Sequence, residues 1–421
     1  MSGADEIVVN YAVELQATGH CASVLLVHRP RAGDPHAARL NTGGIAISSL
    51  ASSRFSSSIA VARKVALQAM RTFSPARRVI RDSSRKIVFG LLQRYHDACC
   101  EHLARSRPDV VHVATPDPGA VMLISAAHAV GVPIVYQEMG LPFHPPGFEE
   151  VYKRFTSVLP LCSEIAVLSP RLAQEMKRRL PEIGHPRVLP LISQDAMNGS
   201  HENGSSSTTT CFGFAARLEH LKGPLRFVDG CAIVHRTLPD IKLKIAGDGS
   251  QRQQVLDSVR RLGLERECHL AGVYTTARAK NLFMRSIDVL VLPSLTEGTP
   301  NVIIEAMAHG KPVIATDVGG IADILSNEVG ILVPLGDARA LGSAMTHLAA
   351  DPELRTKMGL AARKRYEQLF APKVVLPLLI DFYERVVDNH QPLRNRVGQK
   401  SAQRSHPWSY VPALQIEPTG D

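Results

Sequence analysis

Short apolar runs alternate with amphipathic segments along most of this 421-residue chain. Apolar runs bounded by Gly, Pro or Asp predict buried parallel strands, and the longer segments between them predict helices. In the second half, strands are expected at residues 211–215, 243–246, 269–270, 289–292, 313–315 and 330–333. This order predicts a parallel sheet with helices on both faces.

The first half shows the same alternation but begins with a helix instead of a strand. A helix is predicted at residues 5–19, and the first apolar run, 22–27, follows it. A Rossmann-like domain ordinarily starts with a strand, a glycine-rich loop and then this helix. Here the loop is reduced to the residues around Gly3, so the first strand of the N-terminal domain is expected to be missing. Further strands are expected at 108–114, 132–136, 164–168 and 188–192, with helices at 118–129 and 169–180.

A stretch rich in Ser, Thr, Gly and Asn divides the two halves. Residues 193–210 have no apolar period, which is typical of a flexible linker. We therefore predict an α/β fold with an N-terminal Rossmann-like domain at 1–192 and a C-terminal one at 211–389, facing each other across a cleft. The tail at 390–421 has little periodicity and is expected to be disordered.

The composition indicates a globular protein of the cytoplasm. Hydrophobic residues make up 45% and charged residues 21% of the chain, and no uncharged apolar run approaches the roughly 18–20 residues of a membrane span. The N-terminus lacks the basic and then apolar order of a signal peptide. The seven cysteines are scattered without a CxxC pair, which favours a reducing compartment and argues against a zinc site.

Positive charge is concentrated in one part of the first half. The window from Arg54 to Arg107 contains twelve Lys or Arg and three Asp or Glu, which equals the net charge of the whole chain, +9. The window is compatible with an ordinary solvated helical face, or with a surface for anionic phospholipid or a phosphorylated acceptor at the inner face of the membrane. No nucleic-acid motif or aromatic stacking platform accompanies it, so nucleic acid is not an expected partner.

Two glutamates flank a predicted strand-to-helix loop in the second half. Glu297 follows the apolar run, Thr299 is expected to cap the helix with Pro300 as its first residue, and Glu305 lies inside it. Free N–H groups at a helix start favour phosphate, and carboxylates accept hydrogen bonds from sugar hydroxyls. The stretch therefore predicts a nucleotide-sugar site, with two solvated glutamates beside an ordinary turn as the alternative.

A second set of polar residues follows the first strand of this half. Arg217 and Lys222 are five positions apart. Such a pair suits a diphosphate, because arginine offers a planar fork of donors and lysine offers a point charge. It would also stabilise the charge that develops as a nucleotide leaves. Gly247 and Gly249 form a further strand–helix turn. Taken singly, these features are also typical of a surface ion pair and a structural turn.

Together, these motifs resemble the family-four retaining glycosyltransferases, which have the GT-B architecture and an E-x7-E signature. The motifs R-x4-K-G, GDG, PS-x2-EGTPN-x3-EAMA and VGG occur in one order. The resemblance covers roughly residues 3–388 and is specific mainly from 211 to 335.

The resemblance implies roles for individual residues. Glu297 would contact the transferred sugar, Arg217 and Lys222 would hold the diphosphate, and these three form the expected catalytic group. Glu305 would hydrogen-bond the donor ribose. The other expected donor-binding residues are Gly298, Thr299, Asn301, Gly247, Gly249 and Gly3. Transfer would retain the anomeric configuration, with no cofactor and no bound metal.

The chain departs from the family pattern on the acceptor side. Many members spell E-H-G in the N-terminal domain, where this chain has Glu138-Met139-Gly140. Methionine cannot donate a hydrogen bond to a sugar. Glu138 and the nearby His144 are the candidate acceptor-side residues.

The sequence thus predicts a glycosyltransferase that moves a sugar from a nucleotide-diphosphate-sugar to a hydroxyl acceptor. A lipid-linked or surface-polysaccharide acceptor is the expectation raised by the basic window. Two alternatives remain: a catalytically inactive nucleotide-sugar-binding protein, and an epimerase of nucleotide-sugars on the same fold. Fold alone does not decide between them.

Overall fold

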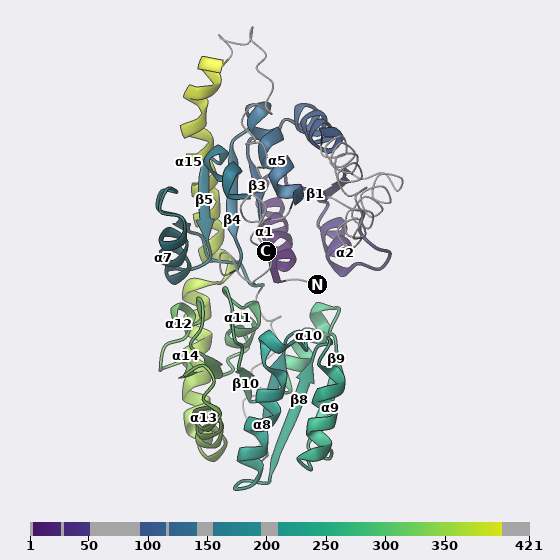
Figure 1. Ribbon diagram of the computed structural model, residues 1–421, viewed down its shortest axis with the longest axis vertical. Coiled ribbons are helices and arrows are strands. Elements are labelled where there is room, and N and C mark those ends of the chain that lie inside the picture. The colour runs from purple at the N-terminus through teal and green to yellow at the C-terminus, as the bar shows by residue number, and fades with distance from the viewer. Residues whose placement is uncertain are drawn as a thin grey trace, which may run out of the picture.

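The computed structural model describes residues 3–26, 29–50, 93–114, 118–140, 155–194 and 209–397. They form two lobes stacked along the long axis of the molecule (Figure 1). The predicted linker at 193–210 and the predicted tail fall largely outside these ranges, as do the basic window up to residue 92 and His144. Residues 93–106, at the end of the basic window, are helical.

The C-terminal lobe is built on a six-stranded parallel sheet in the order β12-β11-β10-β7-β8-β9. Its strands are β7 (Thr210–Ala215), β8 (Ile241–Ala246), β9 (Cys268–Gly272), β10 (Val289–Leu292), β11 (Val313–Thr316) and β12 (Gly330–Val333). Its helices are α8 (Pro224–His235), α9 (Arg252–Arg261), α10 (Ala277–Arg285), α11 (Asn301–Ala308), α12 (Ile321–Ile324), α13 (Ala338–Ala350) and α14 (Pro352–Leu369). Both neighbouring strands β10 and β11 are buried at every residue, as continuous apolar runs predict.

The N-terminal lobe contains two separate parallel sheets, β1-β2 and β3-β4-β5-β6. The strands are β1 (Ser23–Leu26), β2 (Ala46–Ser49), β3 (Val111–Val113), β4 (Ile134–Glu138), β5 (Glu164–Val167) and β6 (Arg187–Val188). The helices with printed bounds are α1 (Gly3–Ala17), α2 (Pro35–Thr42), α5 (Pro118–Ala129) and α7 (Pro170–Arg179). In a doubly wound sheet the first strand is central. Among the described residues, no strand precedes α1 and none joins the two sheets.

Local signals place several of these elements well. Ser169 caps α7 by accepting a hydrogen bond from the backbone N–H of Leu172, and Pro170 is the first helical residue. Gly3 is the first residue of helix α1 and lies in no loop of the described residues, and its contact with the donor stays a prediction.

The C-terminal helix α15 (Pro372–Val397) corrects two predictions. Residues 390–397 continue the helix, so the expectation of disorder from residue 390 is wrong there; adding residues to a formed helix costs less than starting one. The helix also leaves the C-terminal lobe and runs along the N-terminal lobe, where it contacts α1 (Figure 1). On β3, the ring nitrogen Nδ1 of His112 lies 2.6 Å from the hydroxyl of Tyr383. The C-terminal domain expected at 211–389 therefore gives its last helix to the other lobe.

Apolar packing continues from one lobe to the other. One buried cluster includes Ile192 at the end of the N-terminal lobe, Phe370 between α14 and α15, and Val375 on α15. A second cluster belongs to the sheet of the C-terminal lobe alone. None of the described helices combines the length and apolar character needed to cross a membrane.

Candidate donor site

The carboxylate loop, residues 293–300, connects strand β10 to helix α11. The helix begins at Asn301, and Pro300 occupies the capping position with φ −74° and ψ 118°. The prediction that Thr299 caps the helix is therefore wrong by one residue. Proline has no side-chain oxygen, and no side chain caps this helix by a hydrogen bond. Among the described residues, the buried Thr299 hydroxyl has no hydrogen-bond partner, and Thr299 lines the interlobe cavity.

Glu297 is held from two sides. The ammonium of Lys222 donates to its Oε2 at 2.7 Å, and the hydroxyl of Ser294 donates to its Oε1 at 2.7 Å. Only 7% of Glu297 is exposed. Ser294 is three residues before Glu297 in the same motif, but the resemblance implies no role for it. The carboxylate is therefore fixed in place and compensated by one cation.

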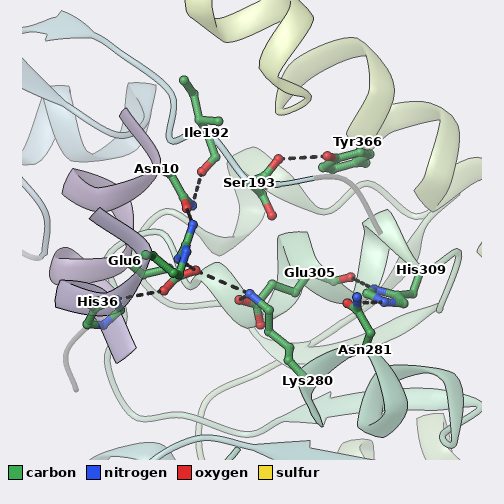
Figure 2. Close-up of polar contacts among 11 residues, drawn as sticks. Glu6, Asn10, His36, Ile192, Ser193, Lys280, Asn281, Glu305, His309 and Tyr366 are labelled. Atoms are coloured by element: carbon green, nitrogen blue, oxygen red, sulfur yellow. Dashed lines mark hydrogen bonds and ion pairs between the residues drawn. The ribbon is translucent and has the colours of Figure 1, made fainter. Parts of the chain in front are cut away.

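Glu305, the fifth residue of α11, is paired with a different cation. Lys280 of α10 donates to its Oε1 at 2.8 Å (Figure 2). Burial alone would lower the pKa of the Lys280 ammonium, but Glu305 and Glu6 raise it above its usual value, so this side chain stays protonated. No sequence motif includes Lys280. The two glutamates of the motif therefore each have a lysine partner, one predicted and one not.

Glycine turns bring the strand ends of this lobe close together. Gly247 has φ 142°, and a Cβ there would lie 1.9 Å from the carbonyl oxygen of Ala216. Gly319 has φ 55°, and a Cβ there would lie 1.7 Å from the carbonyl oxygen of Glu297. Any side chain at either position would displace the backbone. A Cβ on Gly249 would lie 2.6 Å from the carbonyl oxygen of Leu218.

A cavity of about 890 Å³ lies between the lobes and collects most of the predicted site. Its lining includes Arg217, Lys222, Glu297, Gly298, Thr299, Asn301, Glu305, Gly247 and Glu138. Of the described candidates, Gly249 does not line it. The guanidinium of Arg217 makes no hydrogen bond with any residue that the structure describes, which leaves its donors for a ligand. The cavity thus brings together two carboxylates, the lysine partner of each, Arg217 and a helix start.

Glu138 closes the cavity from the N-terminal lobe. The Tyr136 hydroxyl donates to its Oε2 at 2.7 Å, and the backbone N–H of Gly140 donates to its Oε1 at 3.0 Å. Burial raises the pKa of the Glu138 carboxyl, although these hydrogen bonds oppose the shift. A Cβ on Gly298 would lie 2.7 Å from the carbonyl oxygen of Met139. The acceptor-side strand therefore touches the carboxylate loop directly.

The two facing Rossmann-like lobes and the site between them define a GT-B protein. Residues 199–365 match the family model of glycosyl transferases group 1. This match lies in the second half of the chain and agrees with the resemblance that its motifs indicated.

Individual relatives support the same assignment. The chain is 32% identical over 183 residues to a D-inositol 3-phosphate glycosyltransferase of Pseudarthrobacter chlorophenolicus, covering 42% of this chain and 43% of that protein. It is 30% identical over 178 residues to the amylovoran biosynthesis glycosyltransferase AmsK of Erwinia amylovora, covering 41% and 44%. The match thus spans under half the length of these curated relatives.

A solved structure extends the likeness to both lobes. The crystal structure of Anabaena Alr3699/HepE in complex with UDP superposes with a TM-score of 0.67 at 18% identity, covering 91% of this chain and 96% of that chain. At this identity the likeness shows the fold.

Proposed function

We propose that this protein transfers a sugar from a nucleoside-diphosphate-sugar to a hydroxyl acceptor, with retention of the anomeric configuration. The observation that carries the proposal is the pairing of Glu297 with Lys222 and of Glu305 with Lys280 around one interlobe cavity. Burying a carboxylate with its cation partner costs desolvation free energy, so such pairs are kept where their geometry serves a purpose. A nucleoside-diphosphate-sugar has hydroxyls on both sides of its diphosphate, on the ribose and on the sugar. The hydroxyls would donate to the carboxylates, and the diphosphate would accept from the cations.

The diphosphate would lie against the cations of the C-terminal lobe. Arg217 presents a planar fork, and Lys222 presents a point charge 2.7 Å from Glu297. The start of α11 adds backbone N–H groups. The hydroxyl of Thr299, which has no partner among the residues that the structure describes, adds another donor. These groups would stabilise the negative charge that grows on the phosphate as the sugar–phosphate bond breaks.

The sugar and the ribose would each meet one glutamate. Glu297 lies in the loop before α11 and would orient the hydroxyls of the transferred sugar. Glu305 lies inside the helix and would accept hydrogen bonds from the ribose. Close contact between Gly298 and Met139 would exclude water from the reacting centre once the donor is bound.

The donor to test first is a UDP-sugar, since Anabaena Alr3699/HepE was solved with UDP. The acceptor that we propose is a polysaccharide intermediate or a lipid-linked sugar, because one relative is named for amylovoran biosynthesis. The basic window between Arg54 and Arg107 would then hold the protein at the inner face of the membrane. Liposome pull-down that shows no dependence on anionic lipid would remove this membrane role.

The experiment that tests the proposed activity is release of UDP from UDP-glucose and UDP-N-acetylglucosamine, with and without acceptor lipids and glycans, for the wild type and Glu297→Gln. Acceptor-dependent release that Glu297→Gln abolishes supports transfer, and the product's anomeric NMR coupling reports retention. Nucleotide binding without release from any donor would favour the inactive binding protein, which Met139 in place of a donor residue suggests. Conversion of the donor sugar without an acceptor would favour an epimerase.

A further inference from the structure

Lys280 lies between carboxylates from opposite lobes. Its ammonium is 2.8 Å from Oε1 of Glu305 and 3.5 Å from Oε1 of Glu6 (Figure 2). Lys280 and Glu305 belong to the C-terminal lobe, whereas Glu6 is on helix α1 of the N-terminal lobe. One ammonium therefore contacts both the expected ribose carboxylate and the facing lobe.

The lysine is anchored on its own lobe. Its side chain is 20% exposed. The next residue, Asn281, lies 3.2 Å from the ring of His309, and the other nitrogen of that ring lies 2.8 Å from the backbone oxygen of Glu305. Helices α10 and α11 are thus joined beside the ion pair, so Lys280 and Glu305 keep a fixed relative position.

Glu6 is anchored to the segment that joins the lobes. Arg39 donates to Oε1 of Glu6 at 2.9 Å and to Oδ1 of Asn10 at 2.7 Å. The side-chain amide of Asn10 donates to the carbonyl oxygen of Ile192 at 2.8 Å. Ile192 is next to the segment that leaves the N-terminal lobe. A continuous set of polar contacts therefore leads from the connection between the lobes to Glu305.

Both side chains of the interlobe contact are charged at neutral pH. Burial alone would raise the pKa of the Glu6 carboxyl, but Lys280, Arg39 and His36 lower it below its usual value. The carboxylates of Glu305 and Glu6 raise the pKa of Lys280 above its usual value, although burial opposes them. Because these groups are largely buried, salt screens their attraction less than it would screen an exposed pair.

We propose that Lys280 is a positioning residue that couples nucleotide binding at Glu305 to closure of the N-terminal lobe through Glu6. This inference rests on the proposed function, since it takes Glu305 as the ribose ligand. Lys280 compensates the Glu305 carboxylate in both states and gains Glu6 only when the lobes are closed. By linkage, a contact that closure adds beside the nucleotide strengthens nucleotide binding, and the nucleotide in turn favours closure.

A second interlobe ion pair provides a matched control. Arg171 of α7 contacts Asp317 at 2.5 Å, and both side chains are about half exposed, at 44% and 45%. Neither residue lines the interlobe cavity, although both lie in the described part of the chain. Arg171→Gln therefore removes an interlobe contact without touching Glu305.

The test is calorimetric titration of UDP into the full chain. The variants are Glu6→Gln, Lys280→Met, Arg171→Gln, and Lys280→Met combined with each of the other two. We expect Glu6→Gln to weaken UDP binding about fivefold or more, and Lys280→Met at least as much. Adding Glu6→Gln to Lys280→Met should have no further effect, because both remove one contact, whereas the effects of Arg171→Gln and Lys280→Met should multiply.

Different failures have different meanings. If the wild type binds UDP and the effects of Glu6→Gln and Lys280→Met multiply, the coupling is wrong while the proposed function stands. If the wild type binds none of UDP, GDP, ADP and dTDP, both are overturned. Should Lys280→Met fail to fold, the comparison of wild type with Glu6→Gln from about 0.05 to 0.5 M NaCl decides instead. The coupling predicts a steeper salt dependence of UDP affinity in the wild type, and equal slopes contradict it.

Discussion

Lys222 and Glu297 form an ion pair of 2.7 Å although they are 75 positions apart in the chain. The pair follows from sheet order. Lys222 comes shortly after β7, Glu297 comes shortly after β10, and these two parallel strands are neighbours. Their carboxyl ends meet at one edge of the sheet, where open α/β sheets bind ligands.

Removing this lysine should weaken nucleotide binding. Lys222→Ala takes away a charge-assisted contact to the diphosphate, so we expect UDP affinity to fall at least tenfold. At a UDP concentration of a hundred times the wild-type dissociation constant, the stabilisation should drop from about 2.7 to about 1.4 kcal/mol. Thermal unfolding with and without UDP measures this difference.

The control for this variant is Lys242→Ala. Lys242 is an exposed residue of strand β8 in the same lobe. Its removal changes net charge by the same amount and should leave the UDP-induced shift intact. Equal losses in both variants would mean that UDP responds to overall charge and that Lys222 holds no phosphate.

Substitution of the two glutamates should impair different properties of the enzyme. Glu297→Gln keeps the nucleotide contacts and disturbs the sugar, so we expect UDP affinity within about threefold of wild type and a fall in kcat on the order of 100-fold. Glu305→Gln should instead weaken UDP binding itself, because it removes the expected ribose ligand. Titration of UDP and initial-rate kinetics separate the two effects. The same pattern in both variants would argue against separate roles.

The structure of the site shows which of its features could be predicted from the sequence. Glu297 and Lys222 are found because Gly and Pro fix the local turns around them. Lys280 is not, because its pairing with Glu305 depends on where helix α10 packs, and no local pattern encodes that. The end of α15 is missed for a related reason, since Pro392 suggests a break although the helix continues to Val397. Local chemistry is therefore predictable here, and contacts made by packing are not.

Chelation should leave transfer unchanged. Arg217 and Lys222 both line the cavity and provide positive charge for the leaving diphosphate, so the proposed mechanism needs no divalent ion. We expect the rate of UDP release to be the same with and without millimolar EDTA. A loss of activity that Mg²⁺ or Mn²⁺ restores would contradict this expectation and assign the phosphate charge to a metal.

Gly298→Ala should block closure without unfolding the protein. The added Cβ would lie 2.7 Å from the carbonyl oxygen of Met139 and 2.8 Å from Cα of Gly140, both in the facing lobe. The lobes can separate to relieve this clash, so we expect a small change in melting temperature and at least a tenfold loss of transfer. Gly184→Ala is the control, because its Cβ would meet no atom within 4 Å. Full activity in Gly298→Ala would show that this contact is dispensable.

Acid should loosen helix α15 through His112. Burial lowers the pKa of His112 to about 4, although the nearby side chain of Gln137 opposes the shift. A histidine with a lowered pKa favours the neutral form in the folded state. Its stabilising effect is therefore complete above its usual value of about 6.5 and is lost as the pH falls toward 4, by at most about 3 kcal/mol.

His112→Gln tests this contribution, since glutamine is neutral throughout this range. We expect it to cost about 1–2 kcal/mol at pH 7, where it weakens the contact to Tyr383, and to flatten the loss of unfolding free energy between pH 6.5 and 4. The exposed His128 of α5 provides the control as His128→Gln, which should keep the wild-type slope. Urea unfolding at a series of pH values measures all three proteins. If the slopes of wild type and His112→Gln coincide, protonation of His112 does not weaken the contact between β3 and α15, and acid must act elsewhere.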